Sequence, residues 1–271
     1  ESYHAYSTAT GPGSTMNTYF SSYQKYQNSN NISNYISVYG ELTSSHTDPY
    51  LAGMEYPKGS GNYCMYHSGL VMGAKINGQL CVSDSYSWKD FTPGKFDGAG
   101  NEIGHDKGEY GLYQIKAGDG PGTPDWDNWP ASQGAPFAGG QPQLIGQQTT
   151  FVSFTDGVRG GFLGNTPPLK AEVKLTSYTF NDELRKDAIY YKLDITNKNS
   201  LNWDSSYISF FVDPDIGASE DDKMGCDTTL NLIYGYNGNG SDPSYGNTPP
   251  AVGYKLVSTS PGSKLSSCVP F

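Results

Sequence analysis

The chain has 271 residues, of which 35% are hydrophobic, 14% are aromatic and only 16% are charged. This length is sufficient for a substantial core, and the aromatic content excludes an intrinsically disordered protein. The net charge of −10 lacks the basic surface that nucleic acid or an anionic membrane requires, so we expect no nucleic-acid partner. No apolar run approaches the roughly 20 residues of a membrane span, so we expect no membrane insertion.

Glycine (34 residues) and tyrosine (22 residues) are over-used, while charged residues are scarce. Solubility must therefore come from Ser, Thr, Asn and Gln, as in many exported surface proteins. The sequence begins at Glu1 without Met, as a processed mature protein does. These features predict an extracellular or cell-surface location.

Residues 1–30 form a polar, tyrosine-rich segment with almost no aliphatic side chains. Tyr19, Tyr23 and Tyr26 fit one face of a short helix, and a flexible arm is the alternative. Such an arm either lies over its own domain or docks on a neighbouring molecule.

The remainder, residues 31–271, reads as a single β domain. Strand-like segments separated by Gly and Pro are expected at 32–39, 63–75, 79–87, 110–116, 149–155, 169–180, 187–197, 205–213, 229–237 and 251–258. Residues 92–145 are dominated by turn formers and predict a long loop region. With no convincing long helix and no fixed-period repeat, the pattern predicts an antiparallel β-sandwich, jelly-roll or immunoglobulin-like, rather than a propeller or solenoid.

Four cysteines are candidates for disulfides, and no metal-binding spacing relates them: Cys64, Cys81, Cys226 and Cys268. Three connectivities are open, with buried thiols as the alternative. Asn77-Gly78 predicts a type I′ hairpin that sets Ala74 opposite Cys81. In a straight hairpin Cys64 would lie roughly 33 Å from that point, so a Cys64–Cys81 bond would need a bent strand.

The strongest candidate for a metal site is an acidic loop, residues 213–227. Six carboxylates lie within 15 residues after an expected strand, at Asp213, Asp215, Glu220, Asp221, Asp222 and Asp227. A glycine-containing loop rich in hard oxygen donors suits Ca²⁺, although the spacing is not that of an EF-hand. We predict structural calcium here, and a solvated acidic turn is the alternative.

Other polar motifs favour ordinary structure over chemistry. The stretch 97–109 alternates oxygen donors and glycines, but it lacks the full calcium-loop order and reads as a Gly-rich loop. The histidines His4, His46, His67 and His105 are isolated in sequence and are expected to be surface or hydrogen-bonded residues. No nucleophile elbow, phosphate-binding loop or zinc-protease motif is present, so we predict no enzyme activity.

Two tryptophans in the long loop region, Trp126 and Trp129, are candidates for stacking against sugar rings. They lie in the run Asp-Trp-Asp-Asn-Trp-Pro, between the turn formers of residues 120–134. Aromatic residues that anchor the loop to the core are the alternative, because Trp is large and usually mostly buried.

Several short segments, in this order, resemble a known group of proteins. They are Gly53-Met-Glu-Tyr-Pro57-Lys58-Gly59, Ser68-Gly-Leu70 to Lys75, Asn77-Gly78, Asn128-Trp-Pro130 with Gly134-Ala-Pro136, the acidic loop, Tyr236-Asn237, and Pro249 to Tyr254. The set resembles the N-terminal region of large, uncharacterised secreted proteins of Gram-negative bacteria that use type IX secretion.

This resemblance covers about residues 31–254 and implies export with no known catalytic activity. It also implies that the acidic loop is a shared feature, which favours a bound cation there. Relatives tend to carry Gly-Asp-Gln where this chain has Gly146-Gln147-Gln148, so any ligand role of that Asp is missing. They also continue into further domains and a C-terminal sorting domain, so the chain ending at Phe271 is either trimmed or a short member.

Three functions are therefore weighed from the sequence. The first is a non-enzymatic structural protein that self-assembles into a fibre, sheath or surface layer, with the arm of one subunit pairing with the sheet of the next. The second is a carbohydrate-binding or adhesive module that uses Trp126 and Trp129. The third, a glycan hydrolase, is least favoured because most carboxylates lie in turns, which predicts solvated groups of ordinary acidity.

Overall fold

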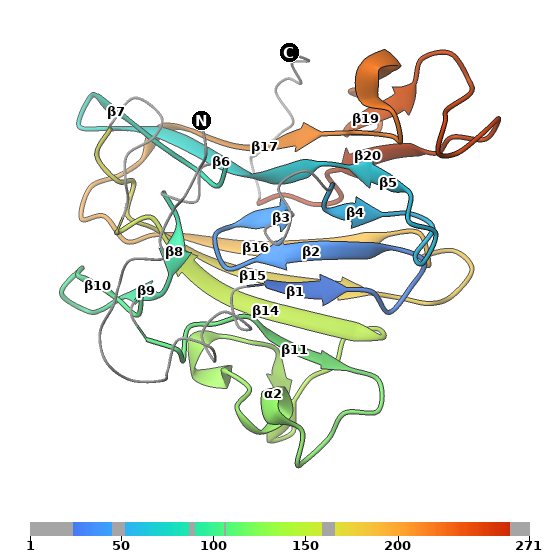
Figure 1. Cartoon of the computed structure of the whole chain (residues 1–271). Helices are drawn as coiled ribbons and strands as arrows, with labels where there is room; N and C mark the ends of the chain where they lie inside the picture. Colours follow the sequence, from blue (N-terminus) through green and yellow to red (C-terminus); the bar gives the residue numbers. More distant parts are fainter. Residues whose placement is uncertain (1–23, 45–51, 87–89, 106, 159–165, 261–271) are drawn as a thin grey trace, which may run out of the picture.

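A computed structural model describes residues 24–44, 52–86, 90–105, 107–158 and 166–260 (Figure 1). It is nearly all β, with 47% strand and 5% helix, and its strands form small antiparallel sheets. The all-β prediction is confirmed.

The first two sheets have four strands each and interleave in sequence. The first has the order β1 (Gln24–Gln27), β2 (Ser33–Ser37), β4 (Met54–Glu55) and β5 (Tyr63–Met65). In the second sheet, β6 (His67–Ile76) pairs with β17 (Asp204–Asp213). β6 also pairs with β3 (Glu41–Thr43) and with β7 (Gln79–Asp84).

The third sheet is the largest, with five strands. Its order is β11 (Tyr113–Lys116), β14 (Gln148–Thr155), β15 (Ala171–Thr179) and β16 (Ile189–Asn197), and β8 (Thr92–Pro93) also pairs with β14. The fourth sheet is a meander of β18 (Asp222–Asp227), β19 (Leu232–Asn237) and β20 (Ala251–Lys255).

The remaining elements are short. Two ribbons pair β9 (Lys95–Phe96) with β10 (Glu102–Ile103), and β12 (Phe137–Ala138) with β13 (Gln141–Pro142). The single-turn helix α2 (Pro124–Asp127) and the 3₁₀ turns Ala131–Gln133 and Ser219–Asp221 complete the set in the part of the chain that the structure describes.

The four larger sheets form a propeller-like ring of four rather than the predicted sandwich. Alternation along a strand reports that one face is buried, but it does not report which sheet covers that face. The absence of a fixed-period repeat in the sequence also does not exclude a ring of sheets. The four sheets differ in strand number, and β17 reaches back across the sequence to β6, so no common period is left in the chain.

The hairpin predicted at Asn77-Gly78 is confirmed. It connects β6 to β7 with Ala74 opposite Cys81, and both turn residues have positive φ, 50° at Asn77 and 79° at Gly78. A type I′ turn requires this conformation at both central positions.

The cysteines do not form the bond between Cys64 and Cys81, because both are buried thiols. Burial raises the pKa of the Cys64 thiol to about 12, which makes it unreactive at neutral pH. Cys226 is disulfide-bonded, and Cys268 lies outside the described residues.

The main hydrophobic core lies where β2, the second sheet and the third sheet meet. Fully buried side chains from these strands include Ile36, Leu70, Phe154 and Leu175, and Phe91 packs edge-to-face on Phe154 with ring centroids 5.3 Å apart. Such aromatic pairs contribute roughly 0.5–1.5 kcal/mol beyond their buried area.

Part of the predicted N-terminal arm belongs to the fold. β1 pairs with β2 over Gln24–Gln27, and the Gln148 side-chain carbonyl accepts hydrogen bonds from the backbone amides of Asn28 (2.9 Å) and Ser29 (3.1 Å). These contacts tie the first sheet to the third. The rest of the predicted arm, residues 1–23, lies outside the described residues.

Candidate functional site

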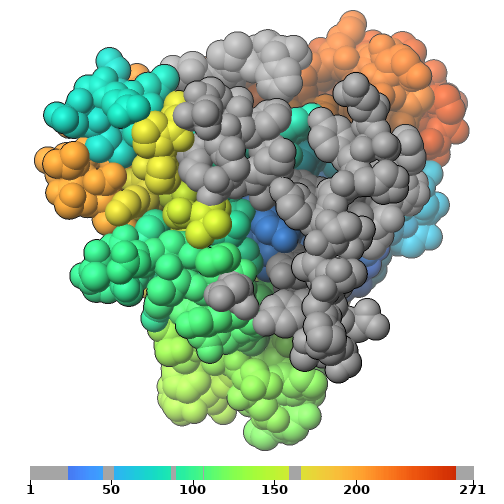
Figure 2. Space-filling view, turned by 60° about the vertical axis from the view of Figure 1, so that its left-hand side comes forward, coloured from blue at the N-terminus to red at the C-terminus, as the bar shows by residue number. Residues whose placement is uncertain are grey.

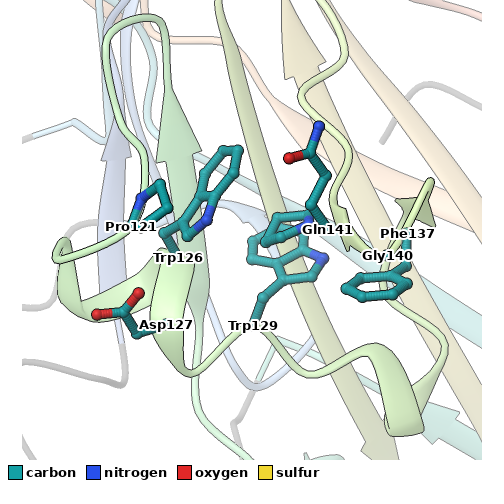
Figure 3. Close-up of a pocket in the computed structure, with 8 residues that line it drawn as sticks. Pro121, Trp126, Asp127, Trp129, Phe137, Gly140 and Gln141 are labelled. Carbon is teal, nitrogen blue, oxygen red and sulfur yellow. The ribbon is translucent and has the colours of Figure 1, made fainter.

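The chain between β11 and β14 lies at the lower end of the molecule (Figures 1 and 2). Residues of this segment line a pocket. We call residues 119–143 the aromatic lobe. The pocket has a volume of about 400 Å³, and we call it the aromatic pocket; it is lined by Pro121, Trp126, Asp127, Trp129, Phe137, Gly140, Gln141 and Pro142 (Figure 3). Both sequence-predicted tryptophans are therefore in its wall.

The local sequence explains how the two tryptophans come together. Pro124 occupies the first turn of α2, where a missing amide costs nothing and a fixed φ favours the helix. The helix ends at once, because Asn128 leaves helical geometry and Pro130 follows. The amide of Trp129 donates to the carbonyl of Trp126 at 3.3 Å, which keeps both residues on one tight turn.

Trp129 forms the rigid floor of the aromatic pocket. Only 8% of it is exposed, its indole Nε1–H donates to the Pro136 carbonyl oxygen at 2.8 Å, and its ring packs on Phe151 of β14. Ile115 and Ala135 complete this small hydrophobic cluster. For the body of Trp129, the core-anchor alternative from the sequence is therefore correct.

The two walls of the pocket are more accessible. Trp126 and Pro121 lie on one side of Trp129, and Phe137, which is 47% exposed, lies on the other (Figure 3). The Trp126 Nε1–H has no hydrogen-bond partner among the described residues, so its donor is available to a ligand.

Polar groups are few in the pocket wall. The Gln141 amide makes no hydrogen bond within the described part of the chain, and it offers both a donor and an acceptor. The Asp127 carboxylate accepts one backbone bond, from Gly122 at 3.1 Å to each oxygen. A carboxylate has about four acceptor positions, so Asp127 keeps most of its capacity.

The acidic loop does not gather its six carboxylates. In the described part of the chain, no three His, Cys, Asp or Glu side chains are placed to hold one metal ion together. Asp227 is used locally, because its carboxylate accepts from the Thr229 hydroxyl and the amides of Thr229 and Leu230, which lowers its pKa. The solvated-turn alternative describes this residue.

The middle of the loop is partly desolvated. Burial, then the charges of Asp213, Asp222 and Glu220, raises the pKa of Asp215 to about 6. Burial likewise raises the pKa of Asp213 and Asp222. Ordinary acidity was predicted for such turn carboxylates, and it fails here because Asp215 is half-buried among like charges.

Asp222 and Asp221 serve the loop backbone and its neighbouring strand. The Asp222 carboxylate accepts from the Ile216 amide at 2.7 Å, and the Asp221 carboxylate accepts from the Asn237 side chain at 3.2 Å. Each also has one buried oxygen without a hydrogen-bond partner, so the loop is not fully satisfied.

Asp242 organises this region and was missed from the sequence. It is 4% exposed, and its carboxylate accepts from the amides of Ala218 (2.8 Å), Ser244 (2.7 Å) and Tyr245 (2.9 Å). Burial alone would raise its pKa, but these backbone bonds outweigh burial and lower it. Gly217 is required opposite it, because φ is +66° and a Cβ would lie 2.1 Å from the Asp242 carboxylate.

The histidines in the described residues are hydrogen-bonded, as predicted. His67 Nε2 lies 2.8 Å from Oε1 of the fully buried Glu41, and its ring packs against Tyr86 and Phe211. His105 Nδ1 lies 2.8 Å from Glu102. His4 and His46 lie outside the described residues.

The Gly-rich stretch at 97–109 is an ordinary loop where it is described. Asp97 accepts hydrogen bonds from the amides of Ala99 (2.8 Å) and Asn101 (2.9 Å), which lowers its pKa. Its carboxylate therefore fixes a turn.

No protein-family model, curated protein or solved structure matches the chain. In the described ranges, none of the helices has the length and apolar character needed to cross a membrane. The aromatic pocket is therefore the feature on which a functional argument rests.

Proposed function

We propose that the chain is an extracellular, non-enzymatic glycan-binding module that uses the aromatic pocket to attach to a surface. The observation that carries the proposal is the wall of the pocket, in which Trp126, Trp129 and Phe137 surround a cavity of about 400 Å³. This volume lies near the lower end of the range for small-molecule sites, about 300–1,000 Å³, and it suits a short saccharide.

The chemistry of the wall matches that of a sugar. One face of a pyranose ring presents C–H groups, which pack on an aromatic face, and its edge presents hydroxyl groups, which need donors and acceptors. Trp126 and Phe137 supply accessible aromatic faces, while Gln141 supplies an amide. Trp129 is held by its bond to Pro136, so the floor is preorganised before any ligand arrives.

The same wall argues for binding without turnover. Glycoside hydrolysis needs two carboxyl groups that flank the scissile bond, about 5–9.5 Å apart. Asp127 is the one carboxylate among the residues that line the aromatic pocket. Binding is the simpler reading of an aromatic wall with a single acid.

An array of immobilised glycans tests the proposal. The intact protein should bind a subset, and Trp126→Ala should reduce that signal at least about tenfold, the equivalent of one lost stacking contact of roughly 1.4 kcal/mol. Tyr207→Ala is the matched control, because Tyr207 is 65% exposed and lies on β17, outside the pocket. Equal loss in both variants, or no glycan bound by the intact protein, overturns the proposal.

An aromatic groove is also the surface that proline-rich peptides use. We favour a glycan because the free amide of Gln141 and the spare capacity of Asp127 suit hydroxyl groups. Binding of an oligoproline peptide, with no glycan bound, would count against the glycan proposal.

Self-assembly is the second candidate function, and it rests on β17. This ten-residue strand pairs with β6 along one edge, and no described strand pairs with its other edge. Tyr207 and Ile208 on it are 65% and 53% exposed, and Leu80 on nearby β7 is 56% exposed. A long, apolar edge strand is the usual template for pairing with another chain.

Electron microscopy of the purified protein tests assembly. Filaments or sheets are expected for the intact chain, and they should be lost in Ile208→Lys, which places a charge on the exposed edge. A chain without residues 1–23 tests the predicted arm and leaves β1 in place. Dispersed particles of the intact protein remove this second candidate and leave glycan binding unaffected.

A further inference from the structure

The wall of the aromatic pocket carries a single formal charge, and that charge is negative. Asp127 is the one formally charged residue in the pocket wall, and no Lys, Arg or His lines it. Anionic sugars, such as uronic acids and sulfated residues, are usually held by Arg or Lys, often through bidentate bonds. The pocket therefore lacks the groups that an acidic glycan requires.

Lysines flank the aromatic lobe, but none of them lines the pocket. Lys25 forms an ion pair with Asp125. The Asp125 carboxylate also accepts a hydrogen bond from the backbone N–H of Gln114 at 2.7 Å. The Lys174 side chain packs against Gly134, behind the 3₁₀ turn. Both lie outside the pocket wall.

A second carboxylate, Asp119, lies on the same lobe but is not one of the residues that line the pocket. Asp119 accepts from the Lys116 amide at 2.8 Å and lies two residues before Pro121. Within the pocket wall itself the one formal charge is the negative charge of Asp127, on a chain whose net charge is −10. An anion in the pocket would therefore meet the Asp127 carboxylate, with no cation among the lining residues to offset it.

The remaining wall selects for shape. The wall presents the rings of Trp126, Phe137, Pro121 and Pro142 together with the amide of Gln141 and the carboxylate of Asp127. A pyranose fits such a surface best when its ring substituents are equatorial, because its axial C–H bonds then form an uninterrupted face. An axial hydroxyl on that face would be pressed against carbon without a partner.

We propose that the aromatic pocket selects uncharged glycans built of pyranoses with equatorial substituents, and that Asp127 at its rim rejects their anionic counterparts. This inference rests on the proposed glycan-binding function and adds the class of ligand. A β-linked glucan is the simplest polymer that meets both requirements.

Affinity electrophoresis in gels with two cellulose derivatives provides the test. Hydroxyethyl cellulose is neutral and carboxymethyl cellulose is anionic, while both share the same equatorial backbone. We expect retardation by the neutral polymer to exceed that by the anionic one by about fivefold or more at low salt, with the gap shrinking once the Debye length falls to about 8 Å or below.

Two variants test whether Asp127 causes the preference for the neutral polymer. Asp127→Asn keeps an acceptor for the Gly122 amide, and it should narrow the ratio between the two polymers. Asp182→Asn removes one charge far along the sequence, on an exposed side chain paired with Arg185, and it should leave the ratio unchanged. Mobilities are compared with and without polymer, which cancels the change in net charge.

The outcomes separate the two proposals. No retardation by hydroxyethyl cellulose, together with no signal on a glycan array, overturns glycan binding itself. Retardation by carboxymethyl cellulose that equals or exceeds that of the neutral polymer overturns only the charge selection, as does an unchanged ratio in Asp127→Asn.

Discussion

Trp129 and Pro136, seven positions apart in the chain, are joined by a hydrogen bond of 2.8 Å from the indole Nε1–H to the backbone carbonyl. The bond closes the aromatic lobe on itself and fixes the tryptophan against Phe151 of the third sheet. Trp126, three residues earlier, has no such bond among the described residues. Two tryptophans of one short motif thus have different roles, one in stability and one in binding.

These two roles predict that alanine variants of Trp129 and Trp126 differ in how much stability they lose. Trp129→Ala should lower the free energy of unfolding by about 3–5 kcal/mol, as for other large buried aromatic residues. Trp126→Ala should lower it by only about 1–2 kcal/mol, because Trp126 is half-buried, yet it should weaken glycan binding at least about tenfold. Urea denaturation followed by circular dichroism measures both values, and similar losses in the two variants would contradict the assignment.

The acidic loop predicts an unusual dependence of stability on pH. The pKa of Asp215 is raised from 3.8 to about 6 in the folded protein, so unfolding releases a proton between about pH 4 and pH 6. The free energy of unfolding should therefore fall as the pH rises through this window, and it should stay lower above it.

Asp215→Asn removes this effect. At pH 7 the variant should be more stable than the intact protein by about 1 kcal/mol, once solvent screening of the half-buried group is allowed for. Near pH 3.5 the two proteins should be equally stable. Thermal melts across the pH range provide the measurement, and a variant less stable at pH 7 would show that the Asp215 charge is stabilising instead.

The calcium site predicted from the sequence has its own test. It requires Asp213, Asp215 and Asp222 to turn toward one ion, which the arrangement of the loop does not show. Calcium bound only to the folded loop should raise the melting temperature, and replacing Asp213 and Asp215 with Asn should abolish the rise. Equal melting temperatures in millimolar calcium and in chelator would remove the prediction.

The cysteines predict a single disulfide. Cys64 and Cys81 are buried thiols, while Cys226 is disulfide-bonded. Peptide mapping without reduction should find Cys226 in a linked peptide and identify its partner. Alkylation should reach Cys64 only after denaturation, because the pKa of its thiol is about 12. A linked peptide that contains Cys64 or Cys81 would contradict the arrangement.

Local patterns in the sequence predicted local structure well. The Asn77-Gly78 turn, its register and the strands on either side follow from the need for positive φ at two adjacent residues. The tryptophan motif at 125–130 was named as a candidate platform because Trp side chains can stack on sugar rings. The structure adds that the two tryptophans share one tight turn, in which the Trp129 amide donates to the Trp126 carbonyl.

Relations between distant segments escaped prediction. The pairing of β17 with β6 and the ring of four sheets depend on which surfaces meet, and alternation along a strand carries no such information. The role of Asp242 was hidden for the same reason. It acts on the amide of Ala218, 24 residues away, and its own sequence context is that of an ordinary turn.

Nuclear magnetic resonance of the tryptophan indole N–H groups tests the central claim most directly. A neutral β-linked oligosaccharide is added to the labelled protein, and Trp126→Ala assigns the key resonance. The account predicts saturable shifts for the Trp126 indole, while the indole of Trp203, which donates to the Leu169 carbonyl, remains unchanged as an internal control. If the Trp126 indole shows no saturable shift, or if the Trp203 indole shifts equally, the result contradicts a glycan site in the aromatic pocket.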